Sequence, residues 1–195
     1  MSQSSTDVLL EGFRTAKNDS VFISQHSAEP FRVYQTDKTI KFDTTDALIK
    51  KLFVSEPGQV IGPFSKGNTR HYFKVLGFEN AYRIHAGIIW IKYREGRSEQ
   101  QMADLTNYIF TEVKNGKDFN AFCHLYSDDN NMRSNCDIGF VYNSKLPPPM
   151  NDDVIKHKTG DLFIVHTSYG YHIIKMLGDP VLEKIKVQFV KLSLK

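Results

Sequence analysis

The chain has 195 residues, of which 41% are hydrophobic and 24% charged, and 25 basic against 22 acidic residues give a formal net charge of +3. These proportions are those of a globular protein that can bury a core, and they exclude a disordered chain. Because charges of both signs are interspersed, nucleic acid is not an expected partner. The longest apolar run, residues 86–91, is far shorter than a membrane span, so we expect this fragment to be soluble and to make no membrane contact.

The first part of the chain contains three segments with a recognisable pattern of apolar and polar residues. They are FISQHSAE at residues 22–29, EPGQVIGPF at residues 56–64 and RHYFKVLG at residues 70–77. The polar segment 28–46 begins at the end of the first of these and precedes the second, and no strand-like segment precedes Asp7.

The elements of the second part can be read from changes in hydrophobic period. Residues 84–93 are rich in isoleucine and aromatic residues, which predicts a buried strand. Ser98 and Gln101 form a capping box for a helix over residues 98–113. The elements expected after it are a helix at 118–126, a turn-like helix or loop at 127–135, a strand at 137–142, a helix at 151–158 that ends near Gly160, and strands at 161–166 and 171–177.

Several segments of the first part recur in the second. His71 and His172 lie 172 − 71 = 101 residues apart, residues 22–29 match residues 122–129 at an offset of 122 − 22 = 100, and Gly58 matches Gly160 at 160 − 58 = 102. Nearly constant offsets predict a duplicated unit of about a hundred residues, which is the size of a small globular domain.

The C-terminal segment 184–194 matches residues 83–93 at an offset of 184 − 83 = 101 and alternates apolar and polar residues. It therefore has the character of a first strand, which the first repeat lacks. We expect it to complete the sheet of the first repeat, beside residues 71–76. The alternative is that it opens a third unit, truncated at the end of the sequence.

The two cysteines, Cys123 and Cys136, have no metal-ligand spacing and predict no disulfide framework, and Cys123 falls on an apolar helix face. The histidines show no helical pair or shared carboxylate that would form a metal site. We expect neither a metal ion nor another cofactor.

The motifs FCHLYSDD, NCDIGFVYNSKL and TGDLFIVHTSYGYHIIKML in residues 84–178 resemble the parvulin (rotamase, PpiC-type) family of peptidyl-prolyl cis-trans isomerases. Two tandem units and the phrase EPGQVIGPF resemble periplasmic foldases of the PpiD and SurA kind, which usually carry a membrane anchor that can precede such a fragment. The resemblance implies an α+β protein with two parvulin-like domains, each a small, mostly antiparallel sheet covered by helices. Residues 5–80 would be a degenerate domain that strand 184–194 completes, residues 81–180 the isomerase domain, and residues 181–195 the C-terminal strand.

The resemblance also assigns a site. It places polar groups at His172, Asp129 and Thr167 and apolar walls at Ile138, Leu146 and Met150, with Phe140 nearby. Each residue has a structural alternative, because His172 alternates with apolar strand residues, Asp129 lies in a stretch typical of caps and turns, and apolar pocket walls have the composition of a core.

Three departures from the family pattern bear on activity. Ile88 stands where active parvulins usually carry a second histidine, the usual glycine pair is Asn135 and Cys136, and residues 147–149 are all proline. Without glycine, the loop is not expected to use positive backbone dihedrals.

The resemblance implies a bacterial periplasmic or cell-envelope protein whose partners are unfolded or extended polypeptides containing X-Pro. Two functions remain open: a prolyl isomerase that acts on exported proteins, or a catalytically weak or inactive chaperone or scaffold module that binds extended segments. A spacer role is a third alternative.

Overall fold

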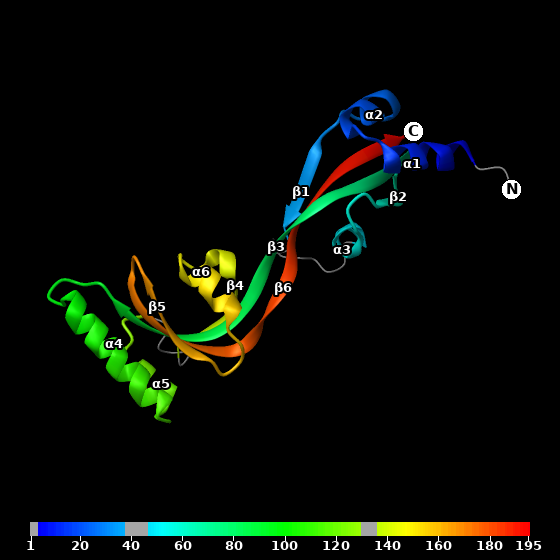
Figure 1. Ribbon diagram of the computed structural model, residues 1–195. Coiled ribbons are helices and arrows are strands. Elements are labelled where there is room, and N and C mark those ends of the chain that lie inside the picture. Colours follow the sequence, from blue (N-terminus) through cyan, green and yellow to red (C-terminus); the bar gives the residue numbers. More distant parts are fainter. Residues whose placement is uncertain (1–3, 38–46, 130–135) are drawn as a thin grey trace. The chain divides into compact units, whose positions relative to one another are not determined.

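The computed structural model describes residues 4–37, 47–129 and 136–195. It is an α+β structure with an antiparallel sheet and helices, and it divides into two compact units (Figure 1). Unit 1 contains residues up to Asn80 and also Lys184–Lys195, whereas unit 2 is the continuous segment Ala81–Glu183. Two long strands, β3 (Thr69–Lys92) and β6 (Gly170–Leu194), contribute residues to both units. No helix in the described ranges is long and apolar enough to cross a membrane.

Unit 2 is built on four antiparallel strands. The second half of β3 pairs with β4 (Asp137–Tyr142), the first half of β6 pairs with β5 (Leu162–Thr167), and β3 and β6 are neighbours. The helices are α4 (Glu99–Lys114), α5 (Phe119–Tyr126) and the short α6 (Met150–Asp153), with 3-10 turns at Asn143–Lys145 and Val154–Lys156.

The alternation of strand residues gives unit 2 two cores. On one face of β3, Ile84, Ala86 and Ile88 pack with residues of α6. On the opposite face, Ile89 and Ile91 pack with α4 and α5. The sheet therefore has apolar side chains on both faces. The first core carries the site described below.

Local sequence signals explain where most of these helices begin. Ser98 and Gln101 form the predicted capping box of α4, and the Asp118 carboxylate accepts the Ala121 N–H at the start of α5. The prediction of a helix over residues 151–158 was wrong: α6 has only four residues, followed by a 3-10 turn. The chain turns away because the Lys158 N–H donates to the Asp161 carboxylate and Gly160 takes a φ of 92°.

The two cysteines are bonded to each other, which was not predicted from the sequence. Cys123 of α5 and Cys136, the residue before β4, form a disulfide with their Cα atoms 6.1 Å apart. A count of two cysteines could not reveal that the fold brings them together. Cys136 has a φ of 58°, so the loop does use a positive dihedral without glycine. Asn135, the other half of the expected glycine pair, lies outside the described residues.

Unit 1 contains α1 (Ser5–Thr15), α2 (Asp19–His26), β1 (Val33–Asp37), α3 (Ala47–Val54) and β2 (Val60–Lys66). β2 pairs with the first part of β3, and β1 pairs with the last part of β6, from Val33 opposite Val190 to Asp37 opposite Lys186. The segment 184–194 thus supplies a strand of unit 1. Its Ser193 hydroxyl lies 2.9 Å from Nδ1 of His71 in β3.

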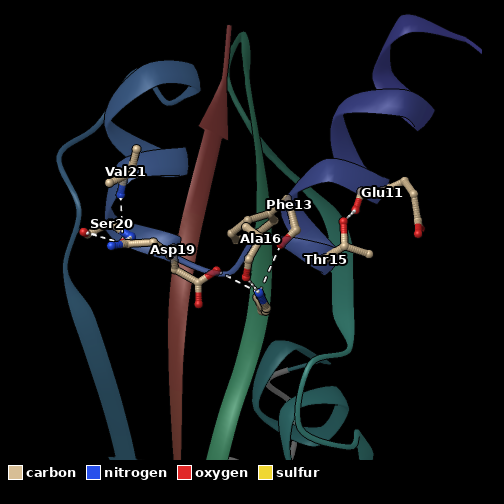
Figure 2. A network of polar contacts seen from close by, with 9 residues as sticks. Glu11, Phe13, Thr15, Ala16, Asp19, Ser20 and Val21 are labelled. Atoms are coloured by element: carbon tan, nitrogen blue, oxygen red, sulfur yellow. Dashed lines mark hydrogen bonds and ion pairs between the residues drawn. The ribbon is translucent and has the colours of Figure 1, made fainter.

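The buried Lys74 links the two N-terminal helices of unit 1 through Phe13, Ala16 and Asp19, which Figure 2 labels. The ammonium group of Lys74 donates to the carbonyl oxygens of Phe13 and Ala16 at 3.1 and 3.4 Å, and it lies 2.8 Å from the Asp19 carboxylate. One cation therefore satisfies the C-terminal end of α1 and the acidic first residue of α2 together.

The two units share local hydrogen-bond patterns. In unit 2, the Ser127 hydroxyl accepts the N–H groups of Trp90 and Asp129, and in unit 1 the Ser27 hydroxyl accepts those of Ser193 and Glu29. The serines are 127 − 27 = 100 residues apart, which is the repeat offset found in the sequence. That unit 1 is a degenerate copy of the fold of unit 2 stays a prediction, and part of its polar segment, residues 38–46, lies outside the described residues.

Candidate active site

A pocket of about 290 Å³ opens on the face of unit 2 that carries α6. Strand β3 contributes Ile88 and Trp90, and the region of α6 contributes Leu146, Pro147 and Met150. The remaining lining residues are Asp129, Tyr169 and His172. The pocket is thus mostly apolar, with one carboxylate and one imidazole among its walls.

His172 lies on β6 opposite Val165 of β5, and only 6% of the residue is exposed. Its Nε2 atom is 2.9 Å from the Thr167 hydroxyl, which also accepts the Tyr169 N–H at 3.1 Å. The turn between β5 and β6 therefore fixes the imidazole from one side. The Trp90 indole donates to the Tyr169 carbonyl oxygen at 3.1 Å, which ties this turn to β3.

Gly170 lets the turn approach β3 closely. It has a φ of 130°, and a Cβ atom there would collide with the carbonyl oxygen of Ile91. Only glycine combines this dihedral with this contact. The glycine of the G-aromatic-H motif therefore sets the position of His172, two residues later.

Asp129 reaches the pocket from the segment that follows α5. The Ser127 hydroxyl accepts the Asp129 N–H at 3.3 Å, and the Asp128 N–H donates to the Trp90 carbonyl oxygen at 2.7 Å. The carboxylate of Asp128 faces away to basic groups, with Arg97 at 2.6 Å and Arg94 at 3.2 Å. Of the two adjacent acids, only Asp129 lines the pocket.

Burial lowers the pKa of His172 from its usual 6.5 to about 4. The main cause is the loss of water around the imidazolium, the nearby Asp129 carboxylate partly offsets it, and the charge of His166 adds a small further lowering. His172 is therefore neutral at physiological pH. A neutral imidazole can donate one hydrogen bond and accept another.

The structure brings five of the residues assigned from the sequence into one pocket: Ile88, Asp129, Leu146, Met150 and His172. Thr167 contacts His172, and Ile138 packs against the core behind the pocket. Phe140 is separate from this lining. It is 65% exposed and its ring lies against His85, with centroids 4.5 Å apart.

Sequence reasoning missed two lining residues, Trp90 and Tyr169. Trp90 could have been found from Ile88, because residues two apart on a strand share a face. Tyr169 lies in the turn TSYG, where no periodic pattern indicates which side chain faces the pocket. Pro147, one of the three prolines that depart from the family pattern, also lines the pocket.

In the ranges that the structure describes, no group of three His, Cys, Asp or Glu side chains is placed to hold a metal ion. Apolar walls of this size suit a small ring, and the His172 imidazole and the Asp129 carboxylate are the polar groups among them.

Residues 71–179 match the sequence profile of the family described as the PPIC-type PPIASE domain. The match covers more than half of the chain, which therefore belongs to the PpiC-type, or parvulin, family of peptidyl-prolyl cis-trans isomerase domains. It is also similar to curated chaperones. The chain is 27% identical over 148 residues to chaperone SurA of Pectobacterium atrosepticum, covering 69% of this chain and 33% of that protein. It is 30% identical over 97 residues to chaperone SurA of Burkholderia pseudomallei, covering 49% and 22%.

The chain thus spans about a third or less of the length of these relatives. Among solved structures, a PpiC-type peptidyl-prolyl cis-trans isomerase domain matches with a TM-score of 0.48 and 22% identity, over 53% of this chain and 94% of that one. The parvulin domain of PpiD from E. coli matches with a TM-score of 0.40 and 22% identity, over 54% and 93%.

Proposed function

We propose that unit 2 catalyses cis-trans isomerisation of X-Pro bonds in unfolded or extended polypeptides. The observation that carries this proposal is the apolar pocket in which a neutral, buried His172 is held by Thr167. Family membership supports the same reaction class.

The reaction needs no nucleophile. Rotation about an X-Pro bond crosses a barrier of about 20 kcal/mol, and each reduction of about 1.4 kcal/mol raises the rate tenfold. Leu146, Met150 and Ile88 would hold the proline ring in this proposal. His172 and Asp129 would act on the twisted amide, in which conjugation between nitrogen and carbonyl is lost.

Thr167 would act as a positioning residue. Its hydroxyl has one proton and two acceptors within reach, Nε2 of His172 at 2.9 Å and the Gly170 carbonyl oxygen at 3.5 Å. The shorter contact is the better hydrogen bond, so we assign the hydroxyl proton to Nε2 and the imidazole proton to Nδ1. In this tautomer Nδ1–H is the only imidazole donor.

A specific observation favours a second candidate function. Ile88, at the position that the resemblance gives to a second histidine, lines the pocket with an aliphatic side chain. Such a pocket can bind an extended segment through apolar anchors without accelerating rotation. Unit 2 would then be a chaperone or scaffold module with weak or no isomerase activity.

We also propose that the protein works in the bacterial periplasm or cell envelope. The buried Cys123–Cys136 disulfide supports an oxidising compartment, and similarity to chaperone SurA supports clients that are exported proteins. Unit 1 would be a non-catalytic domain: Glu29, which corresponds to Asp129, lies 2.6 Å from Lys191 and 3.2 Å from the Ser193 hydroxyl.

The deciding experiment is exchange NMR on short Ala-Pro and Phe-Pro peptides with the full chain. Isomerisation should be faster than in peptide alone, and His172→Ala and Asp129→Ala should each reduce the rate while leaving the fold intact. Leu146→Ala should weaken peptide binding. The matched control is Leu125→Ala on α5, which is exposed and outside the pocket, and it should bind as the native chain does.

Absence of exchange at stoichiometric protein, together with measurable peptide binding, would establish the second candidate. Unchanged rates in both polar variants would contradict the assignment of the site. A His172→Ala variant that unfolds would show that His172 is a structural residue.

A further inference from the structure

The Cys123–Cys136 disulfide does not line the pocket and lies in the core on the opposite face of β3. Both cysteines are buried, at 0% and 1% exposure, within the core formed with α4 and α5. Cys123 lies in α5, before Asp129 in the chain. Cys136 is the first residue of the next described range, 136–195. The bond therefore connects two stretches of chain that both meet β3.

The contact on the Cys136 side is made to Ile88. The Ile88 N–H donates to the carbonyl oxygen of Cys136 at 2.9 Å, and the next pair in the ladder, Gly87 opposite Asp137, begins β4. Cys136 thus holds the backbone of one pocket residue. It does so with a φ of 58°, a conformation that an L residue seldom adopts without support from its surroundings.

The contacts on the Cys123 side are made to Trp90. The carbonyl oxygen of Cys123 accepts the Ser127 N–H at 3.0 Å, and the Ser127 hydroxyl in turn accepts the Trp90 N–H at 3.1 Å. The Asp128 N–H donates to the Trp90 carbonyl oxygen at 2.7 Å. The next residue is Asp129. Its backbone is therefore positioned by the same hydrogen bonds that residues 127 and 128 form with Trp90.

Unit 1 offers an internal comparison. The segment after α2 forms the same three hydrogen bonds. The Ser27 N–H donates to the Ile23 carbonyl oxygen, and the Ala28 N–H donates to the Ser193 carbonyl oxygen. The Ser27 hydroxyl accepts the Ser193 N–H. Ile23 stands where unit 2 has Cys123, at an offset of 123 − 23 = 100. There the acid, Glu29, is held by the Lys191 ammonium group at 2.6 Å. Unit 1 thus forms these hydrogen bonds with isoleucine in place of cysteine, whereas in unit 2 a disulfide also joins the segment to Cys136.

We propose that Cys123 and Cys136 are positioning residues for the pocket: their disulfide fixes the segment 127–129 against Trp90 and Cys136 against Ile88, and so holds Asp129 facing His172. This inference rests on the proposed function for its purpose, but the geometry that it asserts can be tested without a peptide. Breaking the bond should leave unit 2 folded and uncouple Asp129 from His172.

The test compares Asp129→Asn in two backgrounds, the native chain and the variant Cys123→Ala with Cys136→Ala. The pKa of His172 is followed by NMR of its imidazole, on which Asp129 and His166 act. In the native chain, Asp129→Asn should lower this pKa, because a carboxylate that favours the imidazolium is removed. In the disulfide-free chain, the same substitution should leave the pKa unchanged. A second pair of variants with Cys136→Gly keeps the positive φ accessible if alanine impairs folding.

Peptide affinity is the second measurement. The disulfide-free chain should lose as much affinity for a Phe-Pro peptide as Asp129→Asn does, and the two changes together should lose no more. The control is Ile109→Ala, which removes buried atoms from the same core and should lower stability without altering affinity.

An equal effect of Asp129→Asn on the pKa in both backgrounds would overturn the proposal, because the carboxylate would then be placed without the disulfide. Failure of both disulfide-free variants to fold would also overturn it and make the bond a general stabiliser. A native chain that binds no X-Pro peptide would defeat the proposed function alone, since the pKa comparison does not need a peptide.

Discussion

The indole of Trp90 lies nearly parallel to the imidazole of His172, with ring centroids 5.6 Å apart and planes inclined by 14°. The stacked ring covers one face of the imidazole, while Thr167 occupies Nε2. This explains how a histidine at a pocket wall is only 6% exposed and is neutral at physiological pH.

Stability should depend on pH through His172. The pKa of His172 is about 4 in the folded chain and near 6.5 in the unfolded chain, so the unfolded chain binds more protons between these values. The stability that His172 contributes should be fully present above pH 6.5. The free energy of unfolding should fall by up to about 3 kcal/mol as the pH decreases to 4. Urea unfolding followed by fluorescence of Trp90, the single tryptophan, measures this in unit 2. If His172→Gln keeps the same pH dependence over this window, another group is responsible.

Ile88 should contribute both to the core and to the pocket. Ile88→Ala removes a buried side chain and should cost about 2–5 kcal/mol. Ile89→Ala, on the opposite face of β3, should cost a similar amount but leave peptide affinity unchanged. Ile88→His should raise the isomerisation rate if only a second histidine is missing. A folded variant with no gain would show that the surrounding polar contacts have also diverged.

The buried Lys74 should stabilise unit 1. Lys74→Met leaves the Asp19 carboxylate and two carbonyl oxygens without their cation and should cost about 3 kcal/mol. Lys186→Met is the matched control, because the Lys186–Glu79 pair is more exposed and should contribute much less to stability. Hydrogen exchange of α1 and α2 reports the difference. Equal protection in the two variants would mean that packing around Phe13 is sufficient.

Deletion of residues 181–195 should unfold unit 1 and spare unit 2. The deletion removes Val187, Val190 and Leu192, all fully buried, and leaves β1 without its partner strand. NMR spectra of the shortened chain should keep the dispersed signals of unit 2 and lose those of α1, α2 and β2. Retention of both sets of signals would contradict the prediction.

Much of unit 2 could be predicted because its local signals agree with its fold. The caps at Ser98 and Asp118 mark two helices, and DIGFVY coincides with β4. The predicted helix over residues 151–158 was too long. The hydrophobic periodicity of these residues does not show that the Lys158 N–H donates to the Asp161 carboxylate, outside a helix. The disulfide was missed because a spacing of 13 residues does not show which chain segments meet in space.

The residues of the candidate site were assigned from a family resemblance, since periodicity alone gives His172 a structural role. What no pattern could provide is the environment of each group. The low pKa of His172 depends on burial by Trp90 and neighbours distant in sequence, and the place of Asp129 depends on hydrogen bonds from Ser127 to β3.

Because its last strand is the final part of β6, residues 184–194, unit 1 is the later of the two units to be completed during synthesis. Residues 81–183 leave the ribosome before residues 184–194, so unit 2 can fold while α1, α2 and β1 still lack the strand that covers them. Phe13 and Ile23, which are fully buried against Val190 and Leu192 in the finished fold, remain uncovered until then. A nascent chain of this protein therefore exposes apolar surface of its own for as long as unit 2 takes to be made.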